Sequence, residues 1–144
     1  MNPGAGPGAT PRPGVFPVVV GGIAYAPIKP AKGVIKRRRC VVLMKKPGEP
    51  DRFIVIGITS DGGNYDPSDT RRYPRHTYFP MPSEADGHST TGLPLRCAAY
   101  AEFLQDFALQ ELTGTAGYVD AATLDALIAW IQAYILNRGG PGGG

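Results

Sequence analysis

The sequence predicts an α+β domain, and two observations support this prediction. Up to about residue 96, short apolar runs alternate with Gly-, Pro- and Asp-rich turns, which is typical of strands. Beyond residue 97 the apolar spacing becomes that of amphipathic helices. The length of 144 residues fits one domain. Both ends are rich in Gly and Pro, so we expect disordered tails at 1–14 and 138–144 around a domain at 15–137.

The first half of the chain reads as a series of strands. Residues 40–44 form a continuous apolar run, which indicates a strand buried on both faces. This strand covers 34–46, and Pro47-Gly48 begin a turn to its antiparallel partner at 52–59. Further strands are expected at 15–26, 76–81 and 93–96, with polar loops at 60–75 and 82–92.

Two helices are expected in the last third. The first covers 98–112, because Tyr100, Phe103, Leu104 and Phe107 follow the i, i+3, i+4, i+7 spacing of one helix face. Glycines within 113–119 end it. The second helix follows Asp120, which is a good N-cap, and ends near Gly139. Its apolar stripe consists of Leu124, Leu127, Ile128, Ile131 and Ile135.

Charge is unevenly distributed along the chain. The formal net charge is +3, but residues 29–52 hold nine Lys and Arg against two acids. Residues 97–137 hold five acids and no Lys or Arg. A concentrated basic stretch indicates a polyanion partner. The alternative is a solvated strand and turn kept soluble by its charges.

The two cysteines, Cys40 and Cys97, have neither metal-ligand spacing nor a histidine cluster beside them. We therefore expect no metal and no cofactor, and Cys40 as a small core residue. No window reaches the roughly 18–20 apolar residues of a membrane span. A reducing cytoplasmic location fits this composition.

Four stretches, in order, resemble the PemK/MazF/Kid toxin family. In 28–43 a Pro and a Gly precede Arg39, which begins an apolar strand. Thr59-Ser60, followed by GGNY at 62–65, is similar to the Thr-Ser-Gly-Gly-Asn-aromatic stretch of Kid and PemK. Thr90-Thr91-Gly92 with Arg96-Cys97 resembles a second toxin motif, and GYVDAATL at 117–124 resembles the last helix. Together these cover about 23–137.

The resemblance implies an SH3-like β-barrel, here followed by two amphipathic helices, that forms a homodimer. It also implies metal-independent cleavage of single-stranded RNA and a cognate antitoxin protein that blocks the RNA groove. Cleavage needs a base for the ribose 2′-hydroxyl, an acid for the leaving oxygen and cations around the phosphorus.

Candidate catalytic residues follow from these needs. Arg96 matches the catalytic Arg of the family, and Arg39 is a second guanidinium suited to phosphate. The alternative for Arg96 is an arginine at a helix start that pairs with a loop acid. Thr59 would supply a hydroxyl, and His76 a substitute base. His88, Glu84 and Asp86 are further candidates. The expected RNA-binding residues are Lys36, Arg37, Arg38, Ser60, Thr91, Arg71 and Arg72.

Two departures from the family keep other functions open. Ala98 stands where Kid-type toxins carry an Asp, and Val34 stands where they carry a His. The chain is therefore also compatible with a catalytically impaired relative that binds RNA or a protein without cutting. A further alternative is an SH3-like barrel used as a protein-interaction module, including a gyrase-directed toxin.

Overall fold

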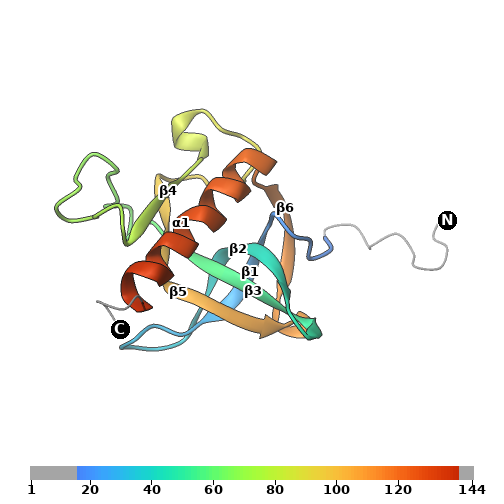
Figure 1. Ribbon diagram of the computed structural model, residues 1–144. Coiled ribbons are helices and arrows are strands. Elements are labelled where there is room, and N and C mark those ends of the chain that lie inside the picture. The colour runs from blue at the N-terminus through green and yellow to red at the C-terminus, as the bar shows by residue number, and fades with distance from the viewer. Residues whose placement is uncertain (1–15, 140–144) are drawn as a thin grey trace.

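Within residues 16–139, six strands form one antiparallel sheet and one α-helix packs on it (Figure 1). The computed structural model describes these residues, with only the backbone of 136–139. The strand order across the sheet is β4-β5-β3-β2-β1-β6. The elements are β1 (Gly22–Ile28), β2 (Lys36–Lys46), β3 (Glu49–Thr59), β4 (Tyr78–Met81), η1 (Glu84–Asp86), β5 (Cys97–Ala108), η2 (Leu109–Glu111), β6 (Thr113–Tyr118) and α1 (Ala121–Gly139).

The predicted α+β class is confirmed, but the sheet is open and does not close into the expected SH3-like barrel. Its edge strands, β4 and β6, do not pair with each other within the described part of the chain. The loop between β4 and β5 instead reaches across to β6, where the Tyr118 N–H donates to the Thr90 carbonyl at 2.9 Å. With only four residues, β4 offers few backbone groups with which a barrel could be closed.

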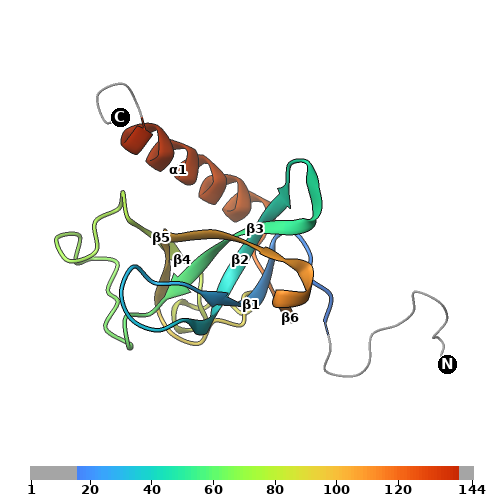
Figure 2. The same cartoon turned by 90° about the horizontal axis from the view of Figure 1, so that it is seen from below.

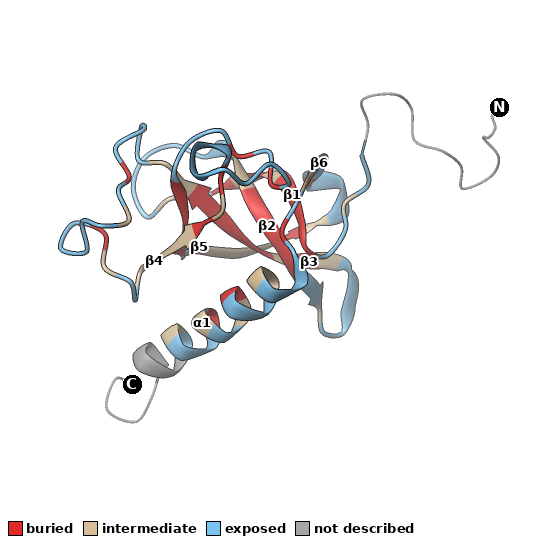
Figure 3. Cartoon of the chain, turned by 90° about the horizontal axis from the view of Figure 1, so that it is seen from above, coloured by how far each residue is buried: buried red, intermediate tan, exposed pale blue. Residues whose placement is uncertain are grey.

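The predicted hairpin is confirmed as β2 and β3. Residues Cys40–Leu43 are all buried, because both faces of the sheet are covered. Val41 and Leu43 point to the side of the helix, and Cys40 and Val42 to the opposite side. Figure 3 shows this burial concentrated on the central strands, with most of the loop residues exposed.

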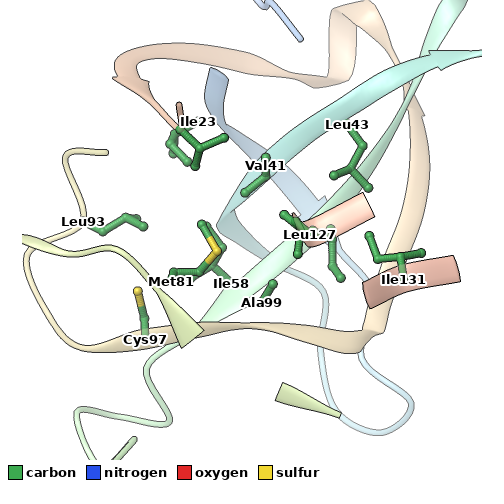
Figure 4. Close-up of a cluster of buried hydrophobic side chains, with 12 residues drawn as sticks. Ile23, Val41, Leu43, Ile58, Met81, Leu93, Cys97, Ala99, Leu127 and Ile131 are labelled. Atoms are coloured by element: carbon green, nitrogen blue, oxygen red, sulfur yellow. The ribbon is translucent and has the colours of Figure 1, made fainter. Parts of the chain in front are cut away.

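Two apolar clusters cover the two faces. The helix-side cluster lies between the sheet and α1 and consists of Ile23, Val41, Leu43, Ile56, Ile58, Met81, Leu93, Cys97, Ala99, Val119, Leu127 and Ile131 (Figure 4). The far-side cluster consists of Ala24, Ala26, Ile28, Cys40, Val42, Phe53, Val55, Phe103, Phe107 and Leu112. Figure 2 shows α1 on one side of the strands only.

The expected helix over 98–112 is wrong, because this segment is β5 followed by one 3-10 turn. Ile56 pairs with Leu104, but Ile58 pairs with Ala99, so β5 carries extra residues in a bulge opposite Gly57. The bulge breaks the period-two alternation. Tyr100 and Phe103, three residues apart, therefore both lie on the far side of the sheet, while Leu104 lies on the helix side, and this spacing imitates that of a helix.

Two smaller expectations also change. Residues 93–96 are not a strand, and 113–118, expected as a loop, form β6. The backbone carbonyls of Phe16 and Thr91 leave no room for a side chain at Gly114 and Gly117, respectively, so glycine is required in β6 by close packing.

The second expected helix is confirmed as α1. The Asp120 carboxylate accepts the Thr123 N–H at 2.7 Å, which is an N-cap bond. The helix continues to Gly139, so the expected tail at 138–144 begins inside it, and its remainder lies outside the described residues, as does the tail at 1–14. In the part of the chain that is described, no helix combines the length and apolar character needed to cross a bilayer.

Replacing Leu127 with Ala should lower the free energy of unfolding by about 2–5 kcal/mol, because this fully buried side chain anchors α1 to the sheet. Ile135→Ala removes a half-exposed side chain from the same helix and should change stability by only about 0.5 kcal/mol. Urea unfolding, monitored by circular dichroism, measures the free energy of unfolding of both variants. Equal losses in the two variants would show that α1 is not docked through Leu127.

Candidate functional site

A pocket of about 220 Å³ opens where the basic start of β2 meets the end of β3. The segment 93–97 forms its third wall. Ile58, Leu93 and Cys97 contribute apolar lining and belong to the helix-side cluster, so the rigid core supports the pocket directly. We call it the arginine pocket; it is lined by Tyr25, Arg37, Arg38, Arg39, Ile58, Thr59, Ser60, Asp61, Gly62, Leu93, Pro94, Leu95 and Cys97.

The three arginines of this pocket differ in how they are engaged. Arg37 donates to the Thr113 hydroxyl at 2.6 Å and to two backbone carbonyls. Arg38 lies over the Phe103 ring, and its buried Nε has no hydrogen-bond partner. The Arg39 guanidinium lies 5.4 Å from the centroid of the Tyr25 ring. Within residues 16–139 no hydrogen bond or ion pair involves Arg39, so its donors are available to an anion.

A tight turn follows Thr59 and shapes the rim of the pocket. Asp61 adopts φ 52°, the left-handed region, as do Gly62 and Gly63 after it. The Asp61 N–H donates to the Thr59 hydroxyl at 3.0 Å, and the Tyr65 N–H donates to the Ser60 carbonyl at 2.9 Å. Asp and Gly tolerate these backbone angles, which is why the sequence SDGG forms this turn.

The loop that follows is held by its own small aromatic core. Tyr65 and Tyr73 are 4% and 2% exposed and pack with Tyr78 around Ala98. Their rings are therefore not platforms on which bases could stack. The helix also holds this loop, because the indole N–H of Trp130 donates to the Arg75 carbonyl at 2.6 Å.

Asp61 connects this loop to the pocket. Its Oδ2 accepts the Tyr73 hydroxyl at 2.6 Å and an Arg72 N–H at 3.2 Å. The hydrogen bond to Asp61 is the largest cause that raises the pKa of Tyr73, to about 12. Arg72, an expected RNA-binding residue, therefore pairs with a carboxylate, whereas Arg71 is exposed.

Arg96, the expected catalytic guanidinium, does not line the arginine pocket. Its Nε donates to the Asp86 carboxylate at 2.9 Å, in a partly exposed ion pair. The hydrogen bond raises the pKa of Arg96 and lowers that of Asp86. The neighbours Leu95 and Cys97 do line the pocket, so the Arg96 backbone passes beside it.

The remaining expected site residues are dispersed. His76 is exposed in the turn before β4, and Lys36 is exposed at the start of β2; neither lines the pocket. His88 lines a separate hollow beside the first turn of α1. Thr91 is 1% exposed, and its hydroxyl donates to the Pro82 carbonyl at 2.9 Å, so it stabilises the loop between β4 and β5.

The two positions that depart from the toxin family have no proton-handling role in this structure. Ala98 is fully buried against the tyrosine core, where a carboxylate would lose its hydration. Val34 is 69% exposed in the loop before β2. Sequence reasoning did not select Asp61 or Tyr25 as site residues. The only signal at Asp61 was its place between Thr59-Ser60 and a Gly-Gly pair.

In comparisons with known proteins, no protein-family model matches the chain, and no curated protein matches it either.

Tyr73→Phe should lower stability by about 0.5–1.5 kcal/mol, because it removes a hydrogen bond to Asp61 and leaves the ring packing in place. Amide hydrogen exchange should accelerate within 61–76. Tyr118→Phe, at an exposed tyrosine, is the matched control and should leave both quantities unchanged. Unaltered exchange in the Tyr73 variant would mean that this hydrogen bond does not hold the loop.

Proposed function

We propose that this chain is an endoribonuclease toxin of the PemK/MazF/Kid type, which binds single-stranded RNA in the arginine pocket and cleaves it without a metal ion. The observation that carries the proposal is the pocket itself. It gathers Arg39, Thr59 and Ser60, which come from two of the four stretches that resemble the family. Guanidinium and hydroxyl groups of this kind are the usual partners of phosphate oxygens.

The electrostatics of the pocket favour a phosphodiester. The lining residues include three consecutive arginines and one carboxylate, so the pocket carries an excess of positive charge. Arginine side chains carry a positive charge at physiological pH, and Arg39 has no hydrogen-bond or ion-pair partner in the described residues. A guanidinium in this state stabilises the additional negative charge that develops on the phosphorus oxygens during cleavage.

The apolar part of the lining suits a nucleobase. Tyr25 and Leu95 stand beside the arginines, and Leu95 is 52% exposed. Proteins hold the bases of single-stranded RNA against aromatic rings and guanidinium planes, while cations hold the backbone. The Arg39–Tyr25 pair offers both surfaces at one point.

A second candidate is an RNA-binding relative that does not cut. Two observations favour it: Arg96 is paired with Asp86 outside the pocket, and Ala98 offers no acid or base. In the nuclease proposal, Arg96 acts only if RNA draws it away from Asp86. The homodimer, the antitoxin and the cytoplasmic location are expectations carried by the resemblance alone.

Purified protein should cleave single-stranded RNA in the presence of EDTA, and Arg39→Gln should slow cleavage by about 10²–10³-fold. The matched control is Lys45→Gln, which removes the same charge from an exposed position near the other end of β2, outside the pocket. Gel analysis of a labelled transcript measures the rates. A strict requirement for a divalent ion, or equal effects of the two substitutions, would contradict the proposal.

Binding separates the two candidates. A fully 2′-O-methylated oligonucleotide lacks the attacking hydroxyl and reports affinity alone, by fluorescence anisotropy at several salt concentrations. Arg39→Gln should reduce the slope of log K against log salt by about 0.7, one phosphate contact of a single strand. Salt-dependent binding without cleavage of unmodified RNA would favour the non-cutting relative. Arg96→Gln then shows whether Arg96 contributes to cleavage.

A further inference from the structure

The arginine pocket contains cations and hydroxyls, but RNA cleavage also needs a group that accepts the proton of the ribose 2′-hydroxyl. No imidazole lines the pocket, because His76 and His88 lie elsewhere. Cys97 is present, but burial raises the pKa of its thiol to about 12, so it stays protonated at neutral pH. Asp61 is the single carboxylate among the lining residues.

Asp61 is held in place by contacts on three sides. Its N–H is bound by the Thr59 hydroxyl, and its carbonyl accepts the Asn64 N–H at 3.0 Å. Its Oδ2 is bound by Tyr73 and Arg72. Within residues 16–139, Oδ1 accepts no hydrogen bond. One carboxylate oxygen is therefore anchored, and the other is open to a ligand.

The backbone at Asp61 is also unusual. Among the described residues it is the only one other than glycine with a positive φ. Asp tolerates a positive φ better than most residues, and such conformations occur both in tight turns and at functional sites. Here the conformation occurs in the turn that lines the pocket, next to Thr59 and Ser60.

We propose that Asp61 is the general base of this site. This inference rests on the proposed nuclease function. The Asp61 carboxylate takes the proton of the 2′-hydroxyl, and the 2′-oxygen forms a bond to the phosphorus. The bond from phosphorus to the 5′-oxygen breaks, and that oxygen takes a proton from water. The hydroxide that remains takes the proton held by Asp61, which restores both the water and the carboxylate. The products are a 2′,3′-cyclic phosphate and a 5′-hydroxyl end.

In this mechanism Tyr73 and Arg72 are positioning residues. Tyr73 donates its hydroxyl to Oδ2 and so orients the carboxylate through a side chain that is itself 2% exposed. Arg39 contributes the positive charge that stabilises the phosphorus oxygens. The general base and this cation therefore come from different walls of one pocket.

Asp61→Asn tests the inference with little change in shape. Cleavage of the labelled transcript should fall by about 10²–10⁴-fold, the usual contribution of a general base. Affinity for the 2′-O-methylated oligonucleotide should not weaken, because a negative charge has been removed. Asp66→Asn, in the same loop but outside the pocket, is the matched control and should cleave at the wild-type rate.

Asp61→Gly tests whether added formate restores cleavage, which would not happen if Asp61 only stabilised the turn. Glycine tolerates the positive φ, and formate can diffuse into the vacated position and supply a carboxylate. Formate should restore part of the lost rate in this variant and have no effect on the wild type.

The outcomes separate the two proposals. If the wild type cleaves and Asp61→Asn cleaves equally well, the assignment of Asp61 is overturned and the nuclease proposal stands. A variant that loses RNA binding together with cleavage, and that formate does not rescue, would show a structural role and would also overturn the assignment. A wild-type protein that does not cleave overturns both proposals.

Discussion

The structure depends on the burial of β2 and β3 on both faces. Cys40–Leu43 would expose half of their apolar surface if only one face of the sheet were covered. The helix covers one face, and the far-side cluster of Phe53, Phe103 and Phe107 covers the other. Because side chains alternate along a strand, a one-residue slip of β2 would exchange these two environments and carry Arg37–Arg39 to the wrong faces. The register that fills the core therefore also positions the arginine pocket.

The central hairpin and the last helix could be predicted from sequence, because their signals are local. A long apolar run, a Pro-Gly turn and an N-cap Asp each act within a few residues. The strand β5 could not be predicted in this way. Its alternation is interrupted by a bulge that depends on Gly57 and Phe103, which lie far apart in sequence but pack together. The prediction of a closed barrel was wrong because β4 has only four residues and does not pair with the other edge strand, β6, within the described residues.

The candidate site also combines features that the sequence predicts with features that depend on tertiary contacts. Arg39, Thr59 and Ser60 were expected to act together, and the structure brings them to one pocket. Arg96 and Thr91 were expected with them, but Asp86 and Pro82 engage their side chains elsewhere. Motif spacing indicates which backbone segments meet. It does not reveal a competing partner such as Asp86, which lies ten residues from Arg96 in the sequence and reaches it through the fold.

The indole of Trp130 gives α1 a second role besides covering the core. Its hydrogen bond to Arg75 joins the far half of the helix to the loop that carries Arg72 and Tyr73. Lifting α1 from the sheet would therefore break this hydrogen bond to the loop as well, and the loop would keep its tyrosine core and its contacts to Asp61. A ligand that displaced α1 from the sheet would thus remove one of the contacts that hold the loop beside the pocket, without touching the pocket itself.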